Sequence, residues 1–275
     1  MNAMSIDLSR LKMPTVSPDG IAAMELIASD DYSLPELSDI ISRDPALSAT
    51  LLKYANSPMY SSATEITNVN RAISVLGAKA LRAAIMVATM RGFTKPDDTS
   101  QLLWEHSQAV SLIAKLIAKR HFPHLADDIE LAALIHDMGA LVLASNYPDQ
   151  YGKIVQTAIS IDNTSTLSQL ENETFGVIHD EVTASFITSC RLPEITGQIL
   201  ADFHHRAPFI ETSDIIQQQT AIISLAHLLE EQINSHNARL NEVIPESLES
   251  LQIHLGLTED DVENFIEDYD EICLS

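Results

Sequence analysis

Apolar residues recur at helical spacing along almost the whole chain, and no segment alternates convincingly as a strand would. The stretch SLPELSDIISRDPALSATLLKYANSP (33–58) contains two such apolar runs: Leu37, Ile40 and Ile41, then Leu47, Leu51, Leu52 and Ala55. Between the runs, Asp44-Pro45 is typical of an N-cap followed by proline at the first helical position. Asn56-Ser57-Pro58 ends the second run. The pattern predicts an all-α fold.

Two breaks in this pattern suggest how the chain is divided. Residues 70–90 read as two helices that meet near Gly77, and the polar stretch TKPDDTS (94–100) reads as a linker. We therefore expect three parts: an N-terminal helical lobe over 1–95, a larger helical lobe over 100–235, and an acidic helical tail over 236–275.

Capping residues mark two helices near the C-terminus. Ser213 is expected to cap a long helix, and Thr258 and Asp261 form a capping pair before the last helix. That last helix carries eight acids and an apolar edge made of Val262, Phe265, Ile266 and Tyr269. We expect it to pack by this edge rather than to serve as an acidic interaction tail.

The chain is strongly acidic, with 16 basic and 39 acidic residues among 275 and a formal charge of −23. Nucleic-acid binding needs a basic footprint, so no nucleic acid is expected as a partner, and the helices around Gly77 read as a plain hairpin rather than a DNA-binding motif. An anionic membrane surface is disfavoured for the same reason.

No segment reaches the roughly 18 apolar residues of a membrane helix. The N-terminus lacks a signal peptide, and Cys190 and Cys273 show no pairing pattern, so we expect a reduced cytoplasmic protein.

The histidines carry the candidate chemistry. Six of the ten lie in or beside apolar helical stretches of the larger lobe: His106, His136, His179, His204, His205 and His227. Asp137 joins them inside the apolar stretch ALIHDMGALVLA (133–144), where a His-Asp pair is costly to bury without a partner. One buried histidine is usually an ordinary hydrogen-bonded core residue, but several on different helices are hard to satisfy without a shared partner. Their ligand types suit a divalent transition metal such as iron, manganese, nickel or zinc.

Helix geometry is compatible with this metal site. His136 and Asp137 point about 100° apart on a helix, so they can converge on an ion that lies between their two directions. Gly139 removes a side chain nearby and lets another backbone or a ligand approach. The other four histidines are expected to be solvated: His121, His124, His236 and His254.

The N-terminal part of the chain resembles the HDOD family, the HD-related output domain of bacterial signalling proteins. The resemblance rests on the DPAL, ANS and LG…LR elements of residues 44–82. It continues through ALIHDMGALVLASNYPDQY, ENETFGVIHDEVTASFITSCRLPEITGQILADFHH and AIISLAHLL, and covers roughly residues 15–235. It implies an all-α fold with an HD-type helical lobe behind a smaller N-terminal helical lobe.

The wider HD superfamily comprises metal-dependent phosphohydrolases, including the HD-GYP enzymes that cleave cyclic di-GMP. The resemblance implies metal ligands in the order of that superfamily: His106 as the first, His136-Asp137 as the naming pair, His179 as the third histidine of two-metal versions, and His204-His205 as the paired histidines. One or two ions are therefore expected.

Three departures separate the chain from the active relatives. Ala140 stands where HD-GYP enzymes have a lysine, and no Gly-Tyr-Pro element follows HHRAP. His227 stands at the position of their closing aspartate. This change replaces a hard, charged ligand by a neutral one and lowers the preference of the site for magnesium or manganese. HDOD proteins are generally regarded as having lost hydrolase activity.

Two functions remain. The first is a regulatory module that contacts signalling proteins in trans, keeps a residual metal site and does not hydrolyse phosphates. The alternative is a metal-dependent phosphohydrolase acting on a nucleotide or cyclic dinucleotide. The acidic field opposes the second, and its nearest phosphate contact, Arg206, reads more readily as a surface arginine.

Overall fold

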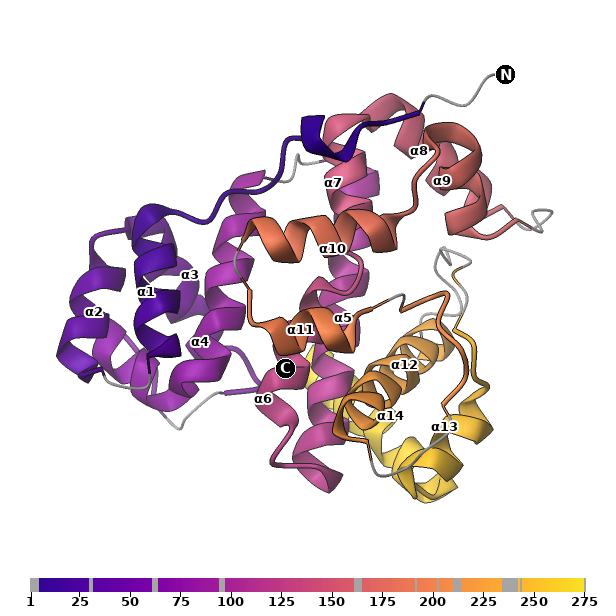
Figure 1. The fold of residues 1–275 in the computed structure, drawn as a ribbon. Helices are drawn as coiled ribbons and strands as arrows, with labels where there is room; N and C mark the ends of the chain where they lie inside the picture. The colour runs from indigo at the N-terminus through magenta and orange to yellow at the C-terminus, as the bar shows by residue number, and fades with distance from the viewer. Residues whose placement is uncertain are drawn as a thin grey trace. The chain divides into compact units, whose positions relative to one another are not determined.

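The computed structural model describes the chain as a set of helices (Figure 1). The described residues are 5–29, 32–60, 64–93, 97–160, 165–190, 192–201, 203–209, 214–233, 242 and 244–274. They form fourteen α-helices and one short 3-10 helix, and no strand occurs among them. The predicted all-α class is confirmed.

The helices divide into two compact units. The small unit comprises Pro14–Thr94 with Glu271–Ser275, and the large unit comprises Met1–Met13 with Lys95–Asp270. Residues 5–13 lie with the large unit, where the Lys12 backbone N–H and C=O exchange two hydrogen bonds with the Asn146 side chain. The large unit also includes most of the segment that we expected to form a separate acidic tail.

Local sequence signals explain the helices of the small unit. These helices are α1 (Pro18–Ala28), α2 (Leu34–Ser42), α3 (Pro45–Ala55) and α4 (Val69–Phe93). The Asp44 carboxylate accepts hydrogen bonds from the backbone N–H groups of Ala46 and Leu47, both at 3.0 Å, which confirms the predicted cap of α3. Gly77 has φ of +73°, which a residue with a side chain rarely adopts. At this point α4 bends by 113°, so the predicted break between two helices is confirmed.

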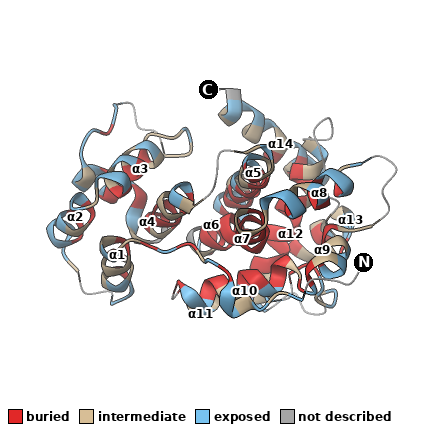
Figure 2. Cartoon of the chain, turned by 90° about the horizontal axis from the view of Figure 1, so that it is seen from above, coloured by how far each residue is buried: buried red, intermediate tan, exposed pale blue. Residues whose placement is uncertain are grey.

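The large unit holds the remaining helices. After the 3-10 helix Leu8–Arg10 they are α5 (Asp98–His121), α6 (Ala126–Ile135), α7 (Met138–Asn146), α8 (Pro148–Ala158), α9 (Leu167–Phe175), α10 (His179–Ser189), α11 (Glu194–Ile199), α12 (Ile215–Ile233), α13 (Leu248–Leu255) and α14 (Glu259–Leu274). Buried residues dominate α7 and α12 (Figure 2). The polar centre described below is therefore built in the interior of this unit.

Helix ends in the large unit correct two predictions and confirm a third. α5 begins at Asp98 with Asp97 as its N-cap, so the last residues of the expected linker are helical, while residues 94–96 lie outside the described part. Ser213 also lies outside it, and the cap observed on α12 is Asp214, whose carboxylate accepts from two backbone N–H groups of the first turn. The predicted capping pair before α14 is confirmed, since Asp261 N–H donates to Thr258 Oγ1 at 3.2 Å.

A close approach of α7 and α10 depends on Gly139. A Cβ atom at this position would lie 2.0 Å from the carbonyl oxygen of His179, far inside any permitted contact. The Gly139 N–H also donates to Thr183 Oγ1 at 2.9 Å. The glycine thus brings the Asp137 end of α7 against the first turn of α10.

No single described helix combines the length and the hydrophobicity that crossing a membrane requires. Among the described helices, only the two halves of α4 meet the length and hydrophobicity requirements when they are counted together. The two halves are bent by 113° relative to each other.

Candidate metal centre

The structure brings six of the seven candidate ligands together inside the large unit. They come from different places in the fold: His106 from α5, His136 and Asp137 from the junction of α6 and α7, His179 from the start of α10, His204 from the turn after α11, and His227 from α12. All six are buried. The convergence of six polar side chains from five parts of the fold on one buried place requires a common partner or a dense network of mutual bonds.

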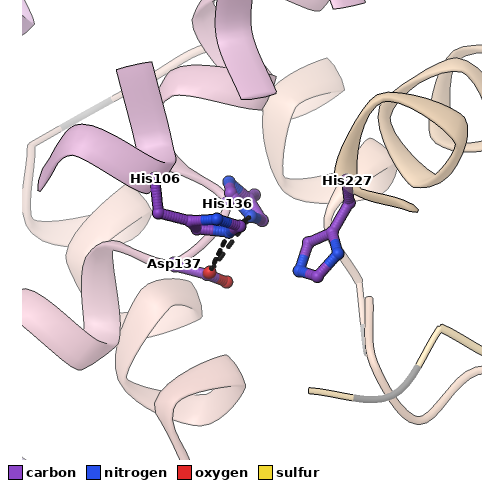
Figure 3. Close-up of side chains that lie close together, drawn as sticks. All are labelled: His106, His136, Asp137 and His227. Atoms are coloured by element: carbon purple, nitrogen blue, oxygen red, sulfur yellow. Dashed lines mark hydrogen bonds and ion pairs between the residues drawn. The ribbon is translucent and has the colours of Figure 1, made fainter. Parts of the chain in front are cut away.

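The first ligand group consists of His106, His136, Asp137 and His227, each of which offers one ligand atom within 4.8 Å of the others. Asp137 Oδ2 lies 3.0 Å from His136 Nε2 and 3.3 Å from His106 Nε2. Figure 3 shows these three side chains gathered on one side, with the His227 ring facing them from α12. The group offers three nitrogens and one oxygen.

The second ligand group consists of Asp137, His179, His204 and Glu242, with ligand atoms again within 4.8 Å of one another. Here the other carboxylate oxygen of the aspartate is used: Asp137 Oδ1 lies 3.7 Å from His204 Nε2 and 3.9 Å from His179 Nε2. Asp137 therefore belongs to both groups, with one oxygen turned toward each.

Hydrogen bonds on the far side of each ring orient the histidines. His136 Nδ1 donates to the Ala133 carbonyl oxygen at 2.8 Å, and His106 Nδ1 pairs with Glu230 at 2.9 Å. When Nδ1 carries the proton, Nε2 of a neutral ring presents its lone pair. The two Nε2 atoms lie 3.3 Å apart and face the same place as Asp137.

Hydrogen bonds at Nδ1 also orient the histidines of the second ligand group. His179 Nδ1 pairs with Glu171 at 2.7 Å, and His204 Nδ1 pairs with Asp180 at 2.8 Å. Carboxylates on the remote nitrogen are typical supports of metal-binding histidines, because they fix the tautomer and raise the basicity of the ring.

Several buried polar atoms have no hydrogen-bond partner, and they point to where an ion would lie. They are Asp137 Oδ1 and Oδ2, His204 Nε2, His227 Nδ1 and Glu242 Oε1. Such atoms are rare in proteins because each costs free energy when it is left unpaired. The buried cluster of imidazoles and carboxylates can hold metal, and the unpaired atoms are those that an ion would satisfy.

The pKa values of several side chains in the cluster are strongly shifted. Burial lowers the pKa of His106, but the carboxylates of Asp137 and Glu230 beside its ring outweigh this effect and hold the pKa well above its ordinary value. Burial raises the pKa of Glu242 well above its ordinary value, and the neighbouring Asp137 charge adds to the effect. Burial and the charges of His106 and His136 lower the pKa of His227 well below its ordinary value. Protons therefore compete with metal at His106 and Glu242, whereas the His227 ring is kept neutral with a lone pair free for metal.

The structure does not bring His205 into either group. Its side chain is 49% exposed, and its Nδ1 lies 3.2 Å from Asp180 Oδ2. Adjacent residues point in different directions, so His204 turns inward and His205 outward.

The other histidines and Arg206 differ in part from expectation. His121 is exposed beside Asp261, and His124 is exposed, as expected for solvated groups, whereas His254 is half-buried and stacks on Phe209. His236 lies outside the described residues. Arg206 is not a surface arginine, since its side chain is 11% exposed and is held by Glu246.

Sequence reasoning missed the carboxylates. Glu171 and Glu230 lie in helices whose polar positions read as solvated, and Glu242 lies in a stretch without helical periodicity. Asp180 carried a usable signal, because His179-Asp180 repeats the dipeptide of the 136–137 pair, but an aspartate in a first helical turn is common for other reasons.

Comparison with known proteins now supplies the family. The pattern of the HDOD domain matches residues 13–207. The chain belongs to the HDOD family. A curated relative from Treponema pallidum (strain Nichols), an uncharacterized protein, is 27% identical over 184 residues, which are 66% of this chain but only 35% of the relative. The chain thus spans about a third of the length of that relative.

Solved structures share the fold. An HDOD domain protein of unknown function from Geobacter sulfurreducens has a TM-score of 0.72 at 22% identity, covering 97% of this chain and 92% of that one. A candidate phosphohydrolase from Shewanella amazonensis SB2B has a TM-score of 0.70 at 17% identity, covering 96% and 92% of the two chains. The predicted HDOD resemblance and its helical fold are confirmed.

Proposed function

We propose that this HDOD protein is a metal-binding regulatory module of bacterial signalling, which acts in the cytoplasm through contacts with other signalling proteins in trans. Its large unit would hold two divalent transition-metal ions, drawn from iron, manganese, nickel or zinc. The observation that carries the metal proposal is the position of Asp137, whose two carboxylate oxygens face two separate groups of ligand atoms. A carboxylate placed in this way would bridge two ions.

The surroundings favour regulation over hydrolysis. Phosphoryl chemistry draws on cations that hold the transferring group. Ala140, fully buried, supplies none at the position three residues after Asp137. Among the described residues, Arg206 is engaged by Glu246 and buried Lys115 by Glu130. The net charge of −23 also opposes the approach of a phosphate.

A metal-dependent phosphohydrolase acting on a nucleotide or cyclic dinucleotide is the second candidate. It is favoured by the shared carboxylate, because hydrolases that cleave phosphate esters often use two ions about 3.5–4 Å apart. When bound, such ions would activate water and stabilise the charge that develops on a phosphate. The buried histidines and Asp137 would position them.

Metal analysis and hydrolysis assays on the same preparations separate these functions. We expect wild-type protein purified without added ions to retain transition metal or to take up two ions per chain, and His136→Ala to lose the ion of the first group. His124→Ala changes an exposed histidine and is the matched control. Wild-type protein that binds no ion under any loading condition would refute the metal centre.

The hydrolysis assay decides between regulation and catalysis. Cyclic and linear nucleotides should survive incubation with metal-loaded wild-type protein. Turnover that disappears in His136→Ala and persists in His124→Ala would replace the regulatory proposal by the phosphohydrolase.

A further inference from the structure

Glu242 reaches the metal centre from a part of the chain beyond the HDOD match, which ends at residue 207. Its side chain is only 1% exposed. Oε2 lies 2.8 Å from His227 Nε2, whereas Oε1 has no hydrogen-bond partner. The carboxylate also lies 3.8 Å from His106 Nε2 and 3.9 Å from His204 Nε2. Glu242 therefore sits among imidazoles from both ligand groups.

The charge of Glu242 needs a cation. Its neighbour in the second group is Asp137, another buried carboxylate, and burying two such charges side by side costs free energy unless a positive charge lies between them. Without Glu242, the second group offers only Asp137 and two imidazoles. With it, the group offers two nitrogens and two oxygens, which is the four-ligand set that a transition metal commonly takes.

A second carboxylate of the same segment is tied to the elements that carry the ligands. Glu246 accepts two hydrogen bonds from the Arg206 guanidinium, at 2.7 and 2.9 Å. Arg206 follows His204 by two residues, and its Nη2 donates to Ser224 Oγ at 2.7 Å. Ser224 precedes His227 by three residues on α12. Glu242 and Glu246 thus bind the segment to the same turn and the same helix.

The segment continues into α13, which packs against α12 (Figure 1). Leu251 and Leu255 are buried, and His254 stacks on Phe209 with ring centroids 4.9 Å apart. The α13 packing is apolar and needs no ion, whereas the contacts that the structure describes for the Glu242 side chain are with histidines of the metal centre. The order of the segment's first residues should therefore depend on the ion.

We propose that Glu242 is a ligand of the second metal ion and that binding of this ion fastens the residues that lead from Glu242 into α13. The inference rests on the proposed metal centre. It assigns a metal-dependent conformational role to residues outside the HDOD match, and it gives the regulatory module a means of turning metal occupancy into a change at the surface.

Metal stoichiometry tests the ligand. Equilibrium dialysis with Mn²⁺ should give two ions per chain for wild type and for Glu249→Gln, an exposed glutamate of α13 that serves as the matched control. Glu242→Gln keeps the size of the side chain and removes its charge. It should bind the second ion at least about tenfold more weakly. Equal affinities in the three proteins would overturn the assignment.

Hydrogen exchange tests the fastening without depending on any variant. Amides of Glu242, Ile244 and Glu246 in wild-type protein should exchange more slowly with Mn²⁺ than with a chelator, whereas amides of α13 should not change, and Glu242→Gln should lose this difference. Unchanged exchange in wild-type protein that binds two ions would refute the fastening and leave the metal centre standing. Wild-type protein that binds no ion would refute both.

Discussion

The interiors of the two units differ in kind. In the small unit, the buried polar residues among those described are only Ser38 and Thr50, and neither is ionisable. The large unit buries a long series of ionisable side chains: His106, Lys115, Glu130, His136, Asp137, Glu171, His179, Asp180, His204, His227, Glu230 and Glu246.

The difference shows that one chain uses two ways of building a core. Apolar burial, worth roughly 25 cal/mol per Å² of area, together with caps such as Asp44, accounts for the small unit. In the large unit, the same burial is offset by the cost of enclosing charge, which is tolerable only when each group finds a partner. Carboxylate oxygens of Asp137 and Glu242 have no hydrogen-bond partner. We therefore expect metal binding to stabilise the large unit and not the small unit.

The largest effect is expected from a cavity in the apolar unit. Leu51 of α3 is fully buried, and Leu51→Ala should lower the free energy of unfolding by about 2–5 kcal/mol. Leu34→Ala removes the same atoms from a side chain that is 45% exposed and should change it by no more than about 0.5 kcal/mol. Hydrogen exchange of the α3 and α4 amides measures the change in the free energy of unfolding in both variants. If the loss of stability in Leu51→Ala depended on added metal, the two units would not differ in their dependence on metal.

Metal removal should have the next largest effect, and only on the large unit. An ion present at a hundred times its dissociation constant stabilises the state that binds it by about 2.7 kcal/mol. Trp104, the single tryptophan, lies on α5 and reports this unit by fluorescence during urea unfolding. A chelator should shift the transition to lower urea. An equal shift in His136→Ala would mean that the stabilising ion binds elsewhere.

Much of the fold could be predicted because its signals are local. Asp44-Pro45 begins α3 and Gly77 bends α4, as the sequence indicates. Contacts between distant parts of the chain could not be predicted in this way. The hydrogen bonds between Lys12 and the distant Asn146 follow from no local pattern.

The candidate site was predictable in its histidines and not in its carboxylates. A histidine at an apolar helical position, such as His106 or His227, stands out from its neighbours. Glutamates are common on solvated helix faces, so Glu171 looks like any other acid until the fold turns it inward. The adjacency of His204 and His205 suggested two ligands, yet backbone geometry sends one of them to solvent.

The smallest effect should come from a carboxylate that supports a ligand without being one. Glu171 accepts hydrogen bonds from both Nδ1 and the backbone N–H of His179, at 2.7 and 2.9 Å. Glu171→Gln keeps the shape and weakens the acceptor, so the affinity for the second ion should fall by about 10–100-fold. The first ion should be less affected because His179 does not belong to its group. Glu173→Gln, an exposed change on the same helix α9, should leave both affinities unchanged. Titration with Mn²⁺ followed by calorimetry measures the two steps separately. If Glu171→Gln weakened both ions equally, the two ligand groups would act as one site, and Asp137 would not separate them.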